Sequence, residues 1–133
     1  MEQVELDFEP RCDDQTLIPN SYTQQWYNYL VQATEQAAKP ISYNHNTGSM
    51  LSDAGFVDIQ ETIVRIPYNP WSTQRQQKEI GSWYSLALDE GLPALCMAPY
   101  YRILGWDKHT IEVMLRPVKQ EIMNKKIHAY NEL

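Results

Sequence analysis

The segment that decides the fold is MLSDAGFVDIQETIVRIP, residues 50–67. Its first part predicts the last turn of a helix that begins near residue 47, because Met50, Leu51 and Ala54 recur at helical spacing. Gly55 follows at the position where a residue in the left-handed region commonly ends a helix. The start of this segment therefore indicates a short helix that is stopped by a glycine.

The rest of the segment predicts one long strand that runs to Pro67. Apolar and polar residues alternate, so one face of an extended chain would carry Val57, Ile59 and Ile63. A half-buried strand is not stable alone, and it needs a sheet to join and helices to cover it. We therefore expect an α/β fold, with the helix–strand unit at 47–67 near its centre.

Two further strands are expected at the ends of the sequence. At 1–9, Val4, Leu6 and Phe8 alternate with acidic residues, and Pro10 is expected to end the strand. At 127–130, the residues Ile-His-Ala-Tyr resemble the start of a strand that is cut short. The whole chain then contains two clear strands and a fragment.

The remaining segments predict helices. Ser21 is a good N-cap for a helix at 21–39, and Asp107 is one for a helix at 107–126. The segment 72–104 reads as two helices, because Gly91 is a typical stop and Pro93 a typical first-turn residue. With the short helix near residue 47, the count is about five helices in a single domain spanning 1–133.

Composition excludes several classes of partner. The net charge is −6 and the basic residues are scattered, whereas phosphate binding needs clustered Lys and Arg, so no nucleic-acid partner is expected. No apolar run reaches the roughly 20 residues of a membrane span, so no membrane partner is expected. The N-terminus has no secretory signal, and Cys12 and Cys96 show no disulfide spacing. We expect a cytoplasmic or nuclear protein that is not secreted.

Motifs of self-sufficient catalysts are absent from the sequence. There is no glycine-rich phosphate loop, no CxxC or HExxH metal motif and no GxSxG nucleophile motif. Asp13 and Asp14 are adjacent acids, but no histidine or third acid sits at ligand spacing, so a solvated turn is expected there and no metal site. The residues alone identify no complete active site.

Aromatic residues are the other conspicuous feature. Trp26 and Tyr29 share a stripe on the first long helix, Trp71 lies in a proline-rich loop, and Trp83 and Tyr84 lie on the following helix. Such residues either fill a core or line a pocket, because tyrosine and tryptophan carry both an apolar body and a polar tip. The helical spacing favours the core, and Trp71 either docks onto the helices or closes over a ligand.

The order of segments resembles the C-terminal half of the S-adenosylmethionine-dependent methyltransferases of fungal secondary metabolism, the LaeA-like group. Besides the helix through Trp26, the resemblance rests on seven short segments: VELD at 4–7, DDQTL at 13–17, AGFVDIQE at 54–61, IPYNPW at 66–71, EIGSW at 79–83, LGW at 104–106 and IHAY at 127–130. It implies a partial Rossmann-like class I methyltransferase fold that begins at the fifth strand of the family's sheet.

The resemblance also implies S-adenosylmethionine as the methyl donor. In such enzymes a glycine-rich turn after the first strand and an acid after the second hold this cofactor. Both belong to the N-terminal half, which this chain lacks, so the resemblance assigns no cofactor-binding residue here.

The resemblance places the acceptor pocket among the helices that follow the fifth and sixth strands. The implied substrate-binding residues are Trp26, Tyr29, Trp71, Trp83 and Tyr84. Glu5, which we expect at the carboxyl end of the first strand, and His128 are the candidates for acid–base or orienting roles. Methyl transfer by in-line displacement depends mostly on such positioning.

Three functions remain open at this point. The chain transfers a methyl group to a small-molecule acceptor if a cofactor half complements it. Alternatively, it is a catalytically inactive module for protein interaction or regulation, whose exposed sheet edge is covered in a homo- or hetero-oligomer. A third possibility, a helical domain that binds a small molecule, rests only on the aromatic content.

Overall fold

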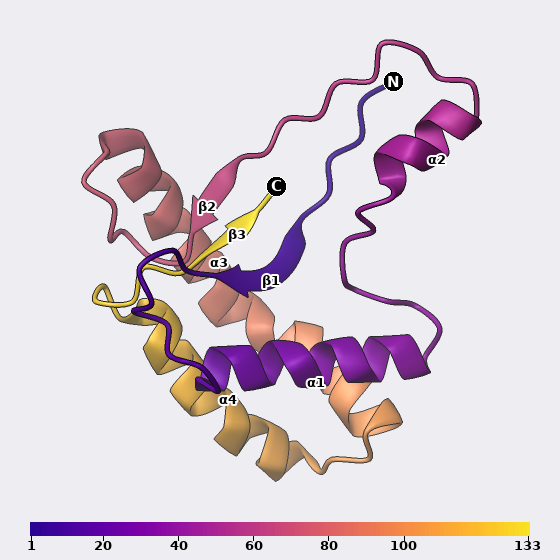
Figure 1. The fold of residues 1–133 in the computed structure, drawn as a ribbon. Helices are drawn as coiled ribbons and strands as arrows, with labels where there is room; N and C mark the ends of the chain where they lie inside the picture. Colours follow the sequence, from indigo (N-terminus) through magenta and orange to yellow (C-terminus); the bar gives the residue numbers. More distant parts are fainter.

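The computed structural model describes all 133 residues, which form an α/β fold of four α-helices and three short strands. Its elements follow one another along the chain (Figure 1) as β1 (Asp7–Arg11), α1 (Tyr22–Gln36), α2 (Thr47–Asp53), β2 (Arg65–Pro67), α3 (Arg75–Ala98), the π-helical turn η1 (Pro99–Ile103), α4 (Lys108–Met123) and β3 (Tyr130–Glu132).

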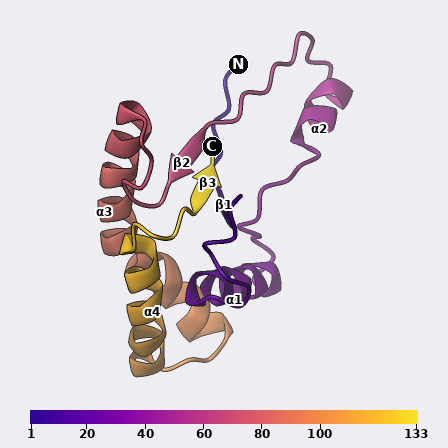
Figure 2. The same cartoon turned by 60° about the vertical axis from the view of Figure 1, so that its left-hand side comes forward.

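The sheet has the strand order β1-β3-β2, and β3 is antiparallel to both of its neighbours. The C-terminal strand therefore lies between the two earlier ones, as Figure 2 shows. Because β1 and β2 both oppose β3, they run in the same direction, and each has one unpaired edge. The carboxyl ends of β1 and β2 consequently lie on the same side of the sheet.

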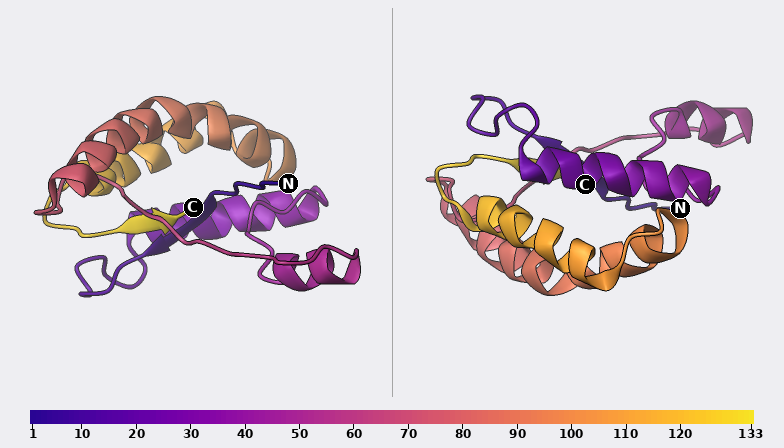
Figure 3. Two further views of the ribbon diagram at one scale, coloured as in Figure 1. Left: turned by 90° about the horizontal axis from the view of Figure 1, so that it is seen from above. Right: turned by 90° about the horizontal axis from the view of Figure 1, so that it is seen from below.

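Three of the helices form the core of the molecule. Helix α1 contacts β1, α4 and η1, while α3 contacts α4 and β2. Seen from above and below, α3, η1 and α4 form an arc that faces α1 (Figure 3). The short helix α2 stands apart and has no buried residue, so it adds little to the core.

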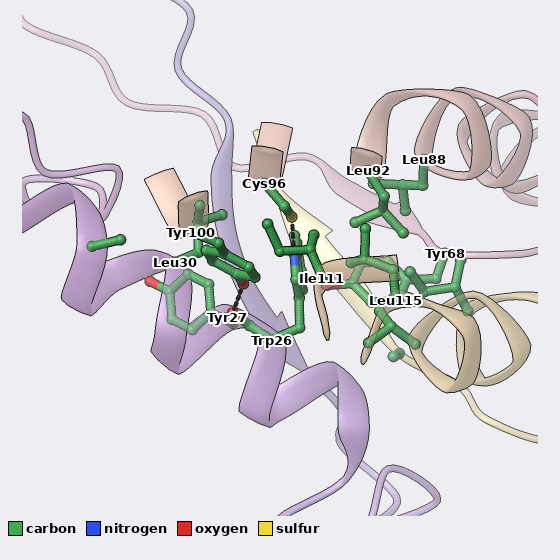
Figure 4. Packing of buried hydrophobic residues seen from close by; sticks show 14 residues of the cluster. Trp26, Tyr27, Leu30, Tyr68, Leu88, Leu92, Cys96, Tyr100, Ile111 and Leu115 are labelled. Atoms are coloured by element: carbon green, nitrogen blue, oxygen red, sulfur yellow. Dashed lines mark hydrogen bonds between the residues drawn. The ribbon is translucent and has the colours of Figure 1, made fainter. Parts of the chain in front are cut away.

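Trp26 occupies the centre of this core and has no exposed surface. Its indole Nε1 donates a hydrogen bond to Cys96 Sγ at 2.9 Å, and its carbonyl oxygen accepts one from the Tyr100 hydroxyl at 2.7 Å (Figure 4). Burial raises the pKa of the Cys96 thiol to about 11. Trp26 therefore joins α1 to the end of α3 and to η1.

The predicted helix ends are largely confirmed. Ser21 Oγ accepts from Gln24 N at 3.2 Å, and Asp107 Oδ1 accepts from Thr110 N at 2.9 Å. Gly55 follows α2 with a φ of +90°. The predicted face of α4 is buried as well, through Ile111, Leu115, Val118 and Ile122. By contrast, α3 begins at Arg75 after Gln74, and no side chain caps its N-terminus.

The expected division of 72–104 into two helices is wrong, because α3 continues through Gly91 and Pro93. Pro93 has no N–H for the carbonyl of Asp89 four residues earlier. That carbonyl instead accepts a hydrogen bond from Lys119 Nζ of α4, and the same ammonium pairs with the Asp89 carboxylate at 2.9 Å. A tertiary contact thus satisfies the Asp89 carbonyl that Pro93 leaves without a helical donor. Because 75–98 is one helix, the chain has four α-helices where about five were expected.

The long strand predicted at 57–67 is also wrong, since only Arg65–Pro67 joins the sheet. The pairing with β3 extends one residue further, through two main-chain hydrogen bonds between Val64 and Leu133 of 2.8 and 2.9 Å. Upstream of Val64 no strand is available as a partner. The apolar residues there are accordingly exposed, with Val57 at 82%.

The two terminal strands are displaced from their expected positions. β1 begins at Asp7, and Pro10, which was expected to end it, lies inside it. An edge strand tolerates proline, because one side of its backbone needs no partner. β3 begins at Tyr130, where the predicted fragment at 127–130 ends. No helix combines the length and the hydrophobicity that a membrane crossing requires.

Candidate functional site

A polar cleft of about 520 Å³ opens at the carboxyl ends of β1 and β2. Three segments form it: the loop after β1, β2 together with the loop and first turn of α3 that follow it, and the chain that leads into the first residue of β3. The side chains that line it are mostly polar: Asp13, Asp14, Arg65, Pro67, Trp71, Ser72, Thr73, Gln74, Gln77, His128 and Tyr130. In α/β sheets, the carboxyl ends of strands are where ligands are usually bound.

Asp14 and His128 form the central contact of this cleft, with 2.5 Å between Asp14 Oδ2 and His128 Nδ1. The other oxygen of Asp14 accepts hydrogen bonds from Thr16 N at 3.1 Å and from Thr16 Oγ1 at 2.7 Å. Hydrogen bonds from Thr16, His128 and Cys12 hold the pKa of Asp14 well below its usual range. The carboxylate is therefore charged and fixed beside the imidazole.

The backbone and the ring of His128 are both held in place. His128 N donates to Thr16 Oγ1 at 2.8 Å, which ties the chain before β3 to the loop after β1. The Trp71 indole stacks on the imidazole, with ring centroids 4.8 Å apart and planes inclined by 29°. Trp71 Nε1 in turn donates to Ala129 O at 3.1 Å. The imidazole is thus fixed from one edge and one face.

Asp13 makes a second set of contacts beside this pair. Its carboxylate accepts from Tyr130 Oη at 2.7 Å and pairs with Arg65 Nη1 at 2.7 Å. These two contacts lower the pKa of Asp13. The Arg65 guanidinium lies 4.6 Å from the centre of the Tyr130 ring, so its charge faces both the carboxylate and an aromatic face.

The structure brings together two of the residues that the sequence singled out, Trp71 and His128. The others lie elsewhere. Trp26 is in the core, and Tyr29 forms a T-shaped contact with Trp106, with ring centroids 4.8 Å apart. Tyr84 Oη donates to Asn131 Oδ1 at 2.8 Å, between α3 and the sheet, while Trp83 is 68% exposed on α3.

Glu5 requires a correction. The sequence placed it at the carboxyl end of the first strand, but β1 begins two residues later, so Glu5 precedes its amino end. It is exposed, and its side chain accepts a hydrogen bond from Gln3 Nε2 at 2.9 Å. It lines a different groove, near the N-terminus, and does not approach His128.

Sequence reasoning missed the acids of the cleft, because it treated Asp13 and Asp14 as a solvated turn. A signal was available: an aspartate two residues before a threonine N–H favours a local turn closed by its own side chain. The contacts across the sheet could not have been read from the sequence, since His128 lies 114 residues from Asp14. No three His, Cys, Asp or Glu side chains converge in a way that would hold a metal ion.

Acidification is expected to release the loop that carries Asp13 and Asp14. Both pKa values are lowered in the folded chain, relative to about 3.9 in an unfolded one. The two carboxylates therefore stabilise the fold above that pH, and their contribution is lost as the pH falls through the lower folded values.

Urea midpoints near neutral pH and near pH 3, roughly one unit below the unfolded value, would check this. A variant with both aspartates replaced by asparagine should lose less stability between the two pH values than the unaltered chain. Equal losses would assign the acid sensitivity to other carboxylates.

Comparison with known proteins finds relatives that match along essentially the whole chain. The chain is 48% identical over its whole length to the secondary metabolism regulator LAE1 of Cochliobolus heterostrophus, of which it covers 44%. It is 47% identical over 99% of its length to the secondary metabolism regulator laeA of Aspergillus flavus, covering 36% of that protein. Identity to the protein-methionine methyltransferase laeA of Emericella nidulans is 42%, again over 99% of the chain and 35% of the relative.

No family model matches the sequence, and no solved structure matches it. The similarity to these regulators is nevertheless continuous, while the chain spans less than half of their length. The chain is therefore related, over essentially its whole length, to a segment of the LaeA-family secondary metabolism regulators.

Proposed function

We propose that this chain supplies the acceptor side of a LaeA-like methyltransferase, which transfers a methyl group from S-adenosylmethionine once a cofactor-binding part complements it. The observation that carries the proposal is the cleft at the carboxyl ends of β1 and β2, with a fixed carboxylate–imidazole pair inside it. The name of the Emericella nidulans relative supports methyl transfer as the reaction. We place this activity in the cytoplasm or the nucleus.

The residues of this chain do not fit S-adenosylmethionine by themselves. The sequence has no glycine-rich turn for the methionine end of the cofactor. The two carboxylates that line the cleft are already engaged, Asp13 with Arg65 and Tyr130, and Asp14 with Thr16 and His128, so neither is free to receive the ammonium or ribose hydroxyls of the cofactor. The cofactor site therefore belongs to another part of the enzyme.

The sheet offers a place for that part to join. β1 pairs only with β3, so its outer edge presents unpaired backbone groups. A further strand along this edge would extend the sheet in the way the class I methyltransferase fold requires, with β1 as the fifth strand. The loop that carries Asp14 follows the carboxyl end of β1. A cofactor site at the carboxyl end of the added strand would therefore lie next to the cleft.

A chimera tests the proposal. The matched segment of the Aspergillus flavus laeA protein is replaced by these 133 residues, and transfer of labelled methyl from S-adenosylmethionine is measured with catechol and with a methionine-containing peptide. We expect the chimera to transfer methyl to one of these acceptors. In isothermal titration with S-adenosylmethionine, we expect the 133-residue chain alone to show no binding. An inactive chimera beside an active parent would contradict methyl transfer, and saturable binding by the chain alone would contradict the assignment of the cofactor site.

A second candidate function is that of an inactive interaction module. It is favoured by a groove of about 690 Å³ between the N-terminal residues and residues 56–64, where Val4, Val57 and Ile63 are exposed. Another chain could cover this apolar surface. Concentration-dependent sedimentation of the isolated chain as a dimer, together with an inactive chimera, would favour this function.

A further inference from the structure

His128 has one ring nitrogen that is engaged and one that is not. Nδ1 lies 2.5 Å from Asp14 Oδ2, whereas no protein group forms a hydrogen bond with Nε2. The side chain is 37% exposed and lines the cleft, and Trp71 covers one face of the ring. The unengaged nitrogen is therefore the one that a molecule in the cleft can reach.

The carboxylate also decides which nitrogen carries the proton of the neutral imidazole. A carboxylate accepts hydrogen bonds and cannot donate one, so in the neutral ring the proton lies on Nδ1. Nε2 then presents its lone pair. This is the arrangement by which a carboxylate orients a histidine as a general base and stabilises the imidazolium that forms.

We propose that His128, positioned by Asp14, accepts the proton of a hydroxyl-bearing acceptor in the cleft. The O–H bond of the acceptor breaks, its electron pair stays on oxygen, and the proton forms an N–H bond at Nε2. The imidazolium is then paired with the Asp14 carboxylate. This inference rests on the proposed function and narrows the class of acceptor to hydroxyl compounds. A hydroxyl must lose its proton on methylation, whereas a thioether such as methionine has no proton to lose.

Other charged groups in the cleft are compatible with this step. Arg65 is the one lysine or arginine side chain that lines the cleft, and it pairs with Asp13 at 2.7 Å. Tyr130 donates to the same aspartate. Cys12, in the loop of Asp14, donates its S–H to that carboxylate at 3.2 Å. These contacts leave Asp14 as the carboxylate that faces the imidazole.

The first test uses the 133-residue chain and does not depend on methyl transfer. Nitrogen NMR of the imidazole should show the proton of the neutral ring on Nδ1 of His128. Asp14→Asn should shift the ring toward a mixture of the two tautomers, while Asp13→Asn removes a neighbouring carboxylate and should leave the His128 tautomer unchanged. A proton on Nε2 in the unaltered chain, or equal effects of the two variants, would overturn the positioning role.

The second test asks whether the cleft takes a proton from a hydroxyl. The probe is 4-nitrophenol, whose phenolate absorbs visible light, added to the unaltered chain at a pH just above the ordinary imidazole pKa of about 6.5, where the free probe is still mostly protonated. We expect a saturable rise in phenolate absorbance that His128→Asn abolishes and Asp14→Asn reduces. The same rise in the His128→Asn variant, or no rise in the unaltered chain, would overturn the proposal.

The chimera then separates this inference from the function on which it rests. In a chimera that methylates catechol, His128→Asn should lower this transfer by about 10²–10⁴-fold, the usual contribution of a general base. An unchanged rate with catechol in the variant, or a chimera that methylates only the methionine peptide, would overturn the inference. A chimera that transfers methyl to neither, while 4-nitrophenol is still deprotonated, would contradict the proposed function and leave the proton-accepting role standing.

Discussion

Replacing Trp26 with alanine is expected to lower the free energy of unfolding by about 3–5 kcal/mol, the usual cost of deleting a buried tryptophan side chain. Trp26 is completely buried, and its indole donates to Cys96 while its carbonyl accepts from Tyr100. The substitution leaves a cavity where α1, α3 and η1 meet, and it removes the partner of a buried thiol. Urea denaturation followed by far-ultraviolet circular dichroism would measure the loss.

Trp83 provides a matched control on the same fold. It is 68% exposed on α3, so Trp83→Ala should change the free energy of unfolding by no more than about 0.5 kcal/mol. If Trp26→Ala is unfolded without denaturant, Trp26→Phe fills most of the same space and should give a measurable, smaller loss. Equal urea midpoints for the two alanine variants would contradict the assignment of Trp26 to the centre of the core.

These two tryptophans show what a helical pattern can and cannot predict. The stripe on α1 predicted Trp26 as a core residue, and the structure confirms it. Helical spacing favoured a core position for Trp83 as well, but the buried face of α3 runs through Gly81, Ser85, Leu88, Leu92 and Cys96. The first two of these positions carry small residues, because α3 lies too close to β2 and the loop after it to leave room for large side chains. A search for large apolar side chains therefore does not find this face.

Local features were predicted better than tertiary ones. The caps at Ser21 and Asp107 and the glycine after α2 depend on residues within one turn, and all three are confirmed. The prediction of a strand at 57–67 was wrong because alternation shows only that a segment is suited to a half-buried strand. The segment forms a strand only where a neighbouring strand pairs with it, and β3 pairs with it only as far as Val64.

The same distinction holds for the cleft. Trp71 and His128 attracted attention as residue types that carry chemistry, and the fold stacks them on each other. Asp14 was overlooked because its partner is distant in sequence and is brought near only when β3 inserts between β1 and β2. A pairing that depends on strand order cannot be read from spacing along the chain.

Replacing Gly81 with alanine is expected to destabilise the fold by about 1–3 kcal/mol, the range typical of an added methyl group in a filled interior. A Cβ atom at this position would lie 2.7 Å from the carbonyl carbon of Asn69, and closer still to its carbonyl oxygen. The loop cannot easily withdraw, because the buried Asn69 amide donates hydrogen bonds to the carbonyl oxygens of Ile122, Asn124 and Ile127. The methyl group must therefore separate α3 from the loop that follows β2.

Gly91 lies in the same helix and should respond in the opposite direction. Apart from the adjacent backbone of α3 itself, no atom lies within 4 Å of a Cβ built there, and its φ is not in the left-handed region, so Gly91→Ala should stabilise the fold by about 0.4–1 kcal/mol by restricting the unfolded chain. Urea midpoints of the two variants should therefore move apart in sign as well as size. If both alanines stabilise the chain equally, helix propensity alone governs α3, and its close contact with the Asn69 carbonyl does not constrain the position of the loop. If Gly81→Ala alone is destabilising, that contact is what sets the distance between α3 and the loop that contributes Trp71 to the cleft.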